Sequence, residues 1–125
     1  MKRFILCLLV PLLCATSAGA TAPPKWYAPL LKLPHSAVRA FECVIYHESR
    51  STFARPNLGD DNANPGDSGI FQIDNTSHGV WGRWVLPHLH VLVWRASAYD
   101  QAWGAVTIYR HDGFAPWSAD AMCFS

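Results

Sequence analysis

The sequence has few charged residues, few cysteines and no hydrophobic run long enough to cross a membrane. Asp, Glu, Lys and Arg make up 15% of its 125 residues, and the formal net charge is +1. A chain this close to neutral lacks the excess of basic residues by which proteins adhere to nucleic acid or to anionic lipid, so we expect neither partner. The apolar run from Phe4 to Leu13 is shorter than the roughly 20 residues that a membrane-spanning helix needs. We therefore expect no membrane anchor.

The apolar run lies in a segment with the three parts of a secretory signal. Lys2 and Arg3 precede it, and Ala18-Gly19-Ala20 follows as a cleavage site of the A-x-A type. We expect residues 1–20 to be a signal peptide and residues 21–125 to be one domain, secreted or otherwise extracytoplasmic. The signal carries two of the 10 Lys and Arg and none of the 9 Asp and Glu, so the mature domain has a formal charge of −1.

Residues 37–49 have the spacing of an amphipathic helix, with Ser36 as its N-cap. The apolar arc of this helix consists of Ala37, Phe41, Val44 and Ile45. At about 100° per residue, Glu48 points to the middle of this arc, whereas Glu42 lies about 120° away. A carboxylate on an apolar face is disfavoured in its charged form. The pKa of Glu48 should therefore rise toward the range in which a general acid is useful.

The next feature is a segment rich in Gly, Asn and Asp, residues 58–69, followed by the apolar run Ile70-Phe71-Gln72-Ile73. This order predicts a turn-rich hairpin that ends in a strand, with a partner strand over residues 51–55. Asp67 lies beside Ser68 and Gly69 at the start of the strand, where water and backbone amides can keep it ionised. Two carboxyl groups in opposite environments are the pattern of glycoside hydrolysis.

The remaining chain is expected to be mainly helical. Residues 87–95 are apolar enough for a buried helical piece, and Ser97 with Asp100 marks the capped start of a helix that ends near Gly113. The chain has four cysteines, of which Cys43 and Cys123 lie outside the signal. Two cysteines in a secreted domain most simply form one disulfide, which would tie the helix of residues 37–49 to the C-terminal end of the chain.

Residues 41–73 resemble the lysozyme superfamily, and they are most similar to the c-type lysozymes. Cys43 lies five residues before Glu48-Ser49, and the later motif is Asp67-x-Gly69-Ile70-x-Gln72-Ile73. The Glu-Ser and Gly-x-x-Gln parts also occur in lytic transglycosylases and actinobacterial resuscitation factors, whereas Asp67 is closer to the c-type pattern. The segment Gly113-Phe114-Ala115-Pro116-Trp117 is similar to the tails of secreted bacterial lysozyme-like proteins. The resemblance extends from about Ser36 to Cys123.

The resemblance implies an α+β, lysozyme-like fold, in which a helical lobe and a small β-hairpin lobe enclose the active-site cleft. It implies cleavage of the β-1,4 bond between N-acetylmuramic acid and N-acetylglucosamine in peptidoglycan. Glu48 would protonate the glycosidic oxygen, and Asp67 would stabilise or trap the oxocarbenium-like centre. The family's pairing of the helix cysteine with one near the C-terminus matches Cys43 and Cys123.

Four further residues are candidates for binding the sugar chain. Gln72 and Asp74 would position substrate at the strand, and Trp81 and Trp84 would line the cleft by stacking on sugar rings. Where the c-type pattern has asparagine, this chain has Asp74, which is thus a second candidate for the second carboxylate. Trp103 and Trp117 are expected in the core.

Two other functions stay open. A lytic transglycosylase needs only the acid Glu48 and forms an anhydro sugar, and a lysozyme-like binding or inhibitory module would use the cleft without cutting. No cofactor or metal site is expected, because His88-x-His90 lacks a third ligand at suitable spacing and Pro65 interrupts the calcium-loop-like run from Asp60. We expect a monomer whose partner is the glycan strand of peptidoglycan.

Overall fold

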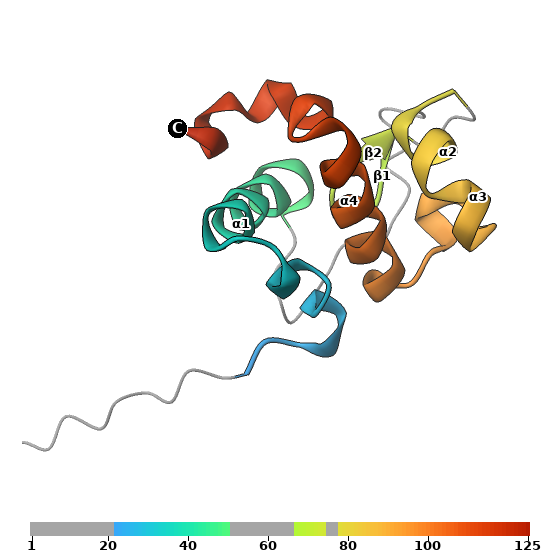
Figure 1. Ribbon diagram of the computed structural model, residues 1–125, viewed down its shortest axis with the longest axis horizontal. Helices are drawn as coiled ribbons and strands as arrows, with labels where there is room; N and C mark the ends of the chain where they lie inside the picture. The colour runs from blue at the N-terminus through green and yellow to red at the C-terminus, as the bar shows by residue number, and fades with distance from the viewer. Residues whose placement is uncertain (1–21, 51–66, 75–77) are drawn as a thin grey trace, which may run out of the picture.

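The computed structural model describes residues 22–50, 67–74 and 78–125, and within them the chain is mostly helical with one small antiparallel sheet (Figure 1). The chain therefore belongs to the α+β class. The expected signal peptide, residues 1–20, and the expected strand over residues 51–55 lie outside the described residues. None of the helices described is long and apolar enough to span a membrane.

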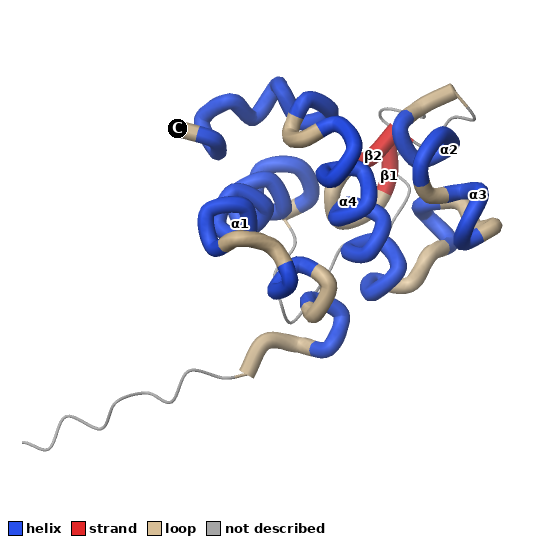
Figure 2. Tube along the Cα trace, viewed as in Figure 1, coloured by secondary structure: helices blue, strands red, loops and turns tan. Residues whose placement is uncertain are grey.

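The α-helices and 3₁₀ helices account for most of the described residues (Figure 2). The α-helices are α1 (His35–Ser49), α2 (Val80–Trp84), α3 (Leu86–Leu89) and α4 (Ala98–Asp112), and the 3₁₀ helices are η1 (Lys25–Tyr27), η2 (Leu30–Lys32), η3 (Val93–Arg95) and η4 (Ala115–Phe124). The sheet pairs β1 (Asp67–Ser68) with β2 (Ile73–Asp74), so that Asp67 lies opposite Asp74. In Figure 1, α4 lies between α1 on one side and α2 with α3 on the other.

Helix α1 has the predicted apolar arc, and all four of its members are buried. The helix begins one residue before Ser36, because Pro34 is the N-cap and its carbonyl accepts from the Val38 N–H at 3.0 Å. The expectation that Ser36 caps the helix was therefore wrong. The helix ends at Ser49, and its C-cap Arg50 has a left-handed backbone with φ 54° and an N–H that donates to the Tyr46 carbonyl at 3.2 Å.

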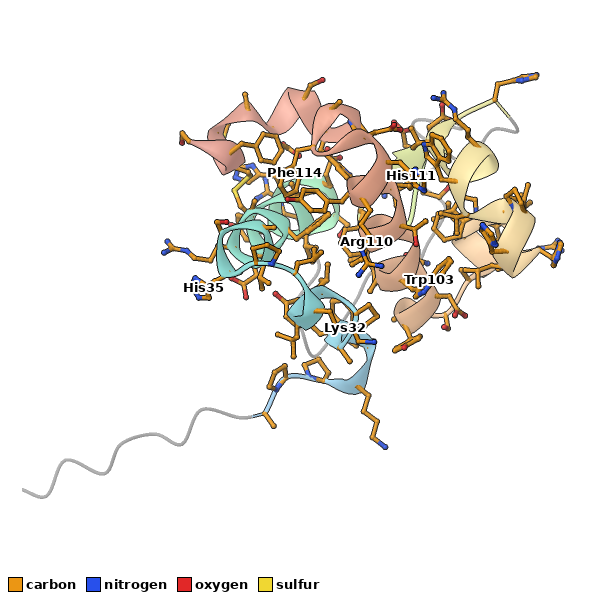
Figure 3. All side chains as sticks on the ribbon, viewed as in Figure 1. Lys32, His35, Trp103, Arg110, His111 and Phe114 are labelled. Atoms are coloured by element: carbon orange, nitrogen blue, oxygen red, sulfur yellow. A yellow bond between two sulfur atoms is a disulfide. The ribbon has the colours of Figure 1, made fainter. Side chains whose placement is uncertain are left out.

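Phe41 of α1 is the centre of an aromatic core. Its ring lies 4.9–5.8 Å, centroid to centroid, from four others, namely Phe71, Tyr109, Phe114 and Trp117. Phe71 belongs to the β1–β2 turn, Tyr109 to α4, Phe114 is the N-cap of η4, and Trp117 lies within η4. A single buried side chain of α1 therefore contacts the turn, α4 and the C-terminal segment. Phe114, labelled in Figure 3, lies between α1 and the C-terminal segment. Edge-to-face contacts of this kind add to the free energy that burial of each ring supplies.

Residues 69–72 form the turn between β1 and β2, and this differs from the strand expected over residues 70–73. Gly69 and Gln72 have positive φ angles of 79° and 43°, and the Gln72 N–H and side-chain amide both donate to the Gly69 carbonyl. Ile70 and Phe71 between them are 0% exposed. The apolar character of this run therefore indicates that the turn is buried. A short apolar run predicts burial, but it does not distinguish a strand from other conformations.

Three side chains from three elements hold this buried turn. Ser49 of α1 donates to the Ile70 carbonyl at 2.7 Å, Gln101 of α4 accepts from the Ile70 N–H at 2.8 Å, and Trp117 of η4 donates to the Phe71 carbonyl at 2.9 Å. A ladder of two residues per strand has few hydrogen bonds of its own. These three contacts therefore help to fix the position of the sheet relative to α1, together with the packing of Phe71 on Phe41.

The predicted C-terminal helix and disulfide are both confirmed. Helix α4 starts at the N-cap Ser97, whose hydroxyl accepts from the Asp100 N–H at 3.1 Å, and ends at Gly113. Cys43 and Cys123 are bonded. The disulfide closes a sequence separation of 80 residues. A loop of this size corresponds to about 4–5 kcal/mol of stabilisation in the chain-entropy account.

Gln101 is 0% exposed, and besides the Ile70 N–H it satisfies the carbonyls of Val93 and Ala96. Gln101→Leu removes one hydrogen bond from each of these three buried backbone groups, of which the Val93 carbonyl still accepts from the Ala96 N–H, so we expect the free energy of unfolding to fall by roughly 2 kcal/mol or more. Urea denaturation measures this. Thr107→Val is the matched control on the same helix, because the Thr107 hydroxyl donates only to the Trp103 carbonyl one turn earlier. Equal stability of the two variants would contradict the role given to Gln101.

Candidate functional site

Glu48 lies in the last turn of α1, with its side chain half-buried at the end of the apolar arc. Glu42, on the same helix, is exposed and accepts a hydrogen bond from the Tyr27 hydroxyl at 2.9 Å. The predicted difference between the two glutamates is therefore confirmed. The C-terminal end of a helix carries partial negative charge, which further disfavours a carboxylate at this position.

The pKa of Glu48 is raised from 4.5 to about 7. Burial is the largest cause, because it removes water from the charged form. A side-chain hydrogen bond with Asp120, the negative charge of Asp120 and then that of Asp67 act in the same direction. Glu48 thus keeps its proton close to neutral pH, as the sequence analysis predicted from the apolar arc.

Asp120 is a site residue that the sequence analysis did not identify. It lies in η4, and its Oδ2 atom is buried without a hydrogen-bond donor among the described residues. A signal for Asp120 was available: it lies three residues before Cys123, which the expected disulfide places against α1.

Asp67 lies on β1, half-buried and opposite Asp74 across the sheet. Its pKa is raised, first by burial and then by the negative charge of Asp74. This corrects the expectation that its surroundings favour the ionised form. Asp67 is nevertheless the sheet carboxylate that acts on Glu48, since the charges that raise the Glu48 pKa are those of Asp120 and Asp67.

Asp74 has a different environment from Asp67. Its carboxylate packs against Gly79, the N-cap of α2, so closely that a Cβ atom on Gly79 would overlap it. Unpaired N–H groups at the start of a helix favour negative charge. Asp74 is therefore placed to stabilise the start of α2 and to repel Asp67, and its role as a substrate contact remains a prediction.

Gln72 stabilises the turn that it belongs to. Its side-chain amide donates to the Gly69 carbonyl at 2.9 Å, and this bond connects the last residue of the turn to the first. The side chain is half-buried, and whether its carbonyl oxygen contacts substrate remains a prediction.

The two tryptophans predicted to line a cleft differ in exposure. Trp81 is 0% exposed, its indole N–H donates to the Val91 carbonyl at 2.9 Å, and its ring occupies the space left by Gly104. Trp81 is thus a core residue, and the expectation that its ring stacks on sugars is corrected. Trp84 is half-buried.

One face of Trp84 is already occupied within the protein. His111, labelled in Figure 3, stacks on its ring with centroids 4.0 Å apart and planes at 2°, and the indole N–H donates to Asp112 at 2.7 Å. These contacts fix the orientation of the ring, so sugar stacking on Trp84 would require the opposite face. Of the two tryptophans expected in the core, Trp117 is 2% exposed and Trp103 is half-buried against the core.

A second region of the surface lies on the other side of α1, around the disulfide. A hollow of about 670 Å³ is lined there by residues that include His35, Arg39, Cys43, Phe114 and Cys123, and neither Glu48 nor an acidic residue is among its lining residues. Within the described ranges, Cys43, His47 and Cys123 bring three potential metal-ligand atoms within 4.8 Å of one another. The two sulfur atoms are bonded to each other, so they are not thiolate ligands.

No protein-family model matches this chain, and neither a curated protein nor a solved structure matches it. The functional interpretation therefore depends on the chemistry of the site residues and on the motifs in the sequence.

The raised pKa of Glu48 makes stability depend on pH. Because the folded pKa of about 7 lies above the ordinary 4.5, Glu48 contributes stability that is fully present below about pH 4.5 and is lost as pH rises through 7. We expect the melting temperature to fall over this range and Glu48→Gln to reduce the fall. Glu42→Gln, the same change on the exposed side of α1, is the control and should retain it. Identical pH dependence of the wild-type and Glu48→Gln proteins in thermal unfolding would contradict the assignment.

Proposed function

We propose that the protein is a secreted glycoside hydrolase that cleaves the β-1,4 bond between N-acetylmuramic acid and N-acetylglucosamine in peptidoglycan. The observation that carries the proposal is a half-buried carboxyl group, Glu48, whose pKa is raised to about 7 beside a second acidic residue, Asp67. A carboxyl group that is still protonated near neutral pH can donate to a leaving-group oxygen. The substrate is inferred from the resemblance of residues 41–73 to the lysozyme superfamily.

In this mechanism Glu48 donates its proton to the glycosidic oxygen as the bond to the sugar breaks. Positive charge then develops at the sugar carbon, and the Asp67 carboxylate stabilises it or forms a covalent bond with it. Water completes hydrolysis, with Glu48 accepting its proton. Retaining and inverting enzymes both need one carboxylic acid and one carboxylate, which is the division proposed for Glu48 and Asp67.

The finer features of the fold belong to the same proposal. A lysozyme-like arrangement would have α1 on one wall of the substrate cleft and the β1–β2 hairpin on the other. The support is the hydrogen bond from Ser49, next to Glu48, to the Ile70 carbonyl, which joins the end of α1 to the hairpin turn. Gln72, Asp74 and Trp84 are the proposed substrate contacts. The protein would act as a monomer on glycan strands, without a cofactor.

A lytic transglycosylase is the second candidate, and the raised pKa of Asp67 favours it. An aspartate that binds a proton more readily is a weaker stabiliser of positive charge, whereas a transglycosylase needs only the acid Glu48. The two reactions give different products from the same peptidoglycan. Mass spectrometry distinguishes them, because the anhydro product of a transglycosylase is lighter by one water. A non-catalytic binding module would release neither product.

Glu48→Gln should abolish cleavage of purified peptidoglycan without unfolding the protein, because glutamine retains the shape and lacks the acidic proton. The matched control Glu42→Gln should be fully active. The wild-type rate should decline on the alkaline side with a midpoint near pH 7, as Glu48 loses its proton. Turbidity loss of wall suspensions measures both, and full activity of Glu48→Gln would exclude the mechanism.

Asp67→Asn tests the second carboxylate. If Asp67 stabilises the charged sugar, this substitution should slow the reaction by about 100-fold or more, and combining it with Glu48→Gln should cost little beyond Glu48→Gln alone. The wild-type rate should also decline on the acid side as Asp67 binds a proton. Near-normal activity of Asp67→Asn would assign the reaction to the transglycosylase class or to Asp74 as the second carboxylate.

A further inference from the structure

The disulfide joins α1 to η4 at a partly exposed position. Cys43 and Cys123 are both half-buried, and both line the hollow of about 670 Å³ on the side of α1 away from the candidate acid. Figure 3 shows the bond, in yellow, between α1 and the C-terminal segment. Solutes that enter the hollow can therefore reach the two sulfur atoms.

His47 places a third donor atom at the same point. It lies four residues after Cys43 on α1, and residues with this spacing share one face of a helix. Its side chain is exposed, and its ring lies edge-on to the Tyr46 ring with centroids 5.6 Å apart. One imidazole nitrogen of His47 and the two sulfur atoms all lie within 4.8 Å of one another.

This arrangement fits the coordination of a zinc ion. Zinc binds cysteine sulfur at about 2.3 Å and histidine nitrogen at about 2.0–2.1 Å in tetrahedral geometry, which places the ligand atoms roughly 3.5–4 Å from one another. Once the bond between the sulfur atoms is broken they must separate, whereas no ligand atom has to approach from farther than 4.8 Å. Small side-chain rotations supply movements of this size.

The two cysteines are thiols before their disulfide forms, and a dithiol reductant restores them. The reductant's two thiols become a disulfide, and the Cys43–Cys123 bond accepts two electrons and two protons. Zinc then displaces the two thiol protons, which pass to water, while the imidazole donates a lone pair. Because two thiolates balance the charge of the metal, the basic residues of the hollow, His35 and Arg39, do not oppose its binding.

We propose that Cys43, His47 and Cys123 form a zinc site in the reduced protein, with water as the fourth ligand. Thiolate ligands favour zinc over magnesium and calcium, which prefer oxygen. In this form the metal holds the C-terminal segment on α1, as the disulfide does in the oxidised protein. The inference goes beyond the proposed function, because none of the three ligands takes part in the proposed cleavage.

The test uses the full chain with Cys7→Ser and Cys14→Ser, so that Cys43 and Cys123 are its only source of thiols. A phosphine reduces the disulfide without adding a thiol that binds metal. Cobalt(II) is the probe, since it occupies tetrahedral zinc sites and absorbs light when a thiolate binds it. The reduced protein should bind one cobalt ion with this absorption, zinc should displace it, and the oxidised protein should show none. A reduced protein without the thiolate absorption overturns the inference.

His47→Ala tests the nitrogen ligand. His35→Ala is the matched control, because His35 belongs to the same helix and lines the same hollow but is not one of the three grouped residues. Loss of a residue that supports a metal ligand typically weakens binding by about 10–100-fold, and loss of a ligand weakens it at least as much. We expect His47→Ala to weaken zinc binding by at least about 10-fold and His35→Ala to leave it unchanged. Equal affinities of reduced His47→Ala and its reduced parent overturn the three-ligand site.

Stability gives a second readout. Zinc should raise the melting temperature of the reduced protein and leave that of the oxidised protein unchanged, because an ion that binds the folded state stabilises it. If the reduced chain is unfolded without metal, zinc should restore its near-ultraviolet circular dichroism, and His47→Ala should respond less. Failure of zinc either to stabilise or to refold the reduced protein overturns the inference. Since none of these measurements involves peptidoglycan, their outcome is independent of the proposed function.

Discussion

The hydrogen bonds that reach the turn of residues 69–72 determine where the sheet carboxylates lie. The sheet has only two residues in each strand, so its own ladder cannot fix its orientation. The backbone of Ile70 and Phe71 is instead bound by side chains of α1, α4 and η4. Because these backbone groups are buried, each bond lost would leave a polar group unsatisfied, which disfavours other positions of the turn. The position of Asp67 relative to Glu48 follows from this constraint.

The charges around Glu48 disfavour the ionised form of its carboxyl group. Glu48 is at the end of the apolar arc, near the negative end of α1, and its charged neighbours from η4 and β1 are acidic. Burial of unpaired charge is costly, and a protein that needed only stability would have a hydrophobic residue or a counter-ion here. The cost is offset elsewhere, by an aromatic core centred on Phe41 and by the disulfide. Strain of this electrostatic kind is typical of sites where a proton is transferred.

Helix periodicity was enough to predict much of this site. The arc of α1, the contrast between Glu48 and Glu42 and the Ser97 cap of α4 all follow local rules, in which a residue's neighbours in sequence determine its environment. The disulfide spans 80 residues, and it was predictable because Cys43 and Cys123 are the two cysteines outside the expected signal.

The parts that were missed depend on contacts distant in sequence. Ile70 and Phe71 read as a strand because a buried turn and a buried strand have the same apolar composition. Trp81 was assigned to a surface because the space that Gly104 leaves for it is 23 positions away. Asp120 reaches Glu48 only through the return of the C-terminal segment along α1.

The fit of Trp81 against Gly104 has a consequence for how the sequence can diverge. A methyl group at position 104 would occupy the place of the Trp81 ring, so residue 104 cannot become larger unless residue 81 becomes smaller. Substitutions at these two positions should therefore occur together among descendants of this chain, with a larger residue on α4 accompanied by a smaller ring on α2. This constraint acts at a distance from Glu48 and Asp67, because neither Trp81 nor Gly104 is among the acidic residues of the candidate site.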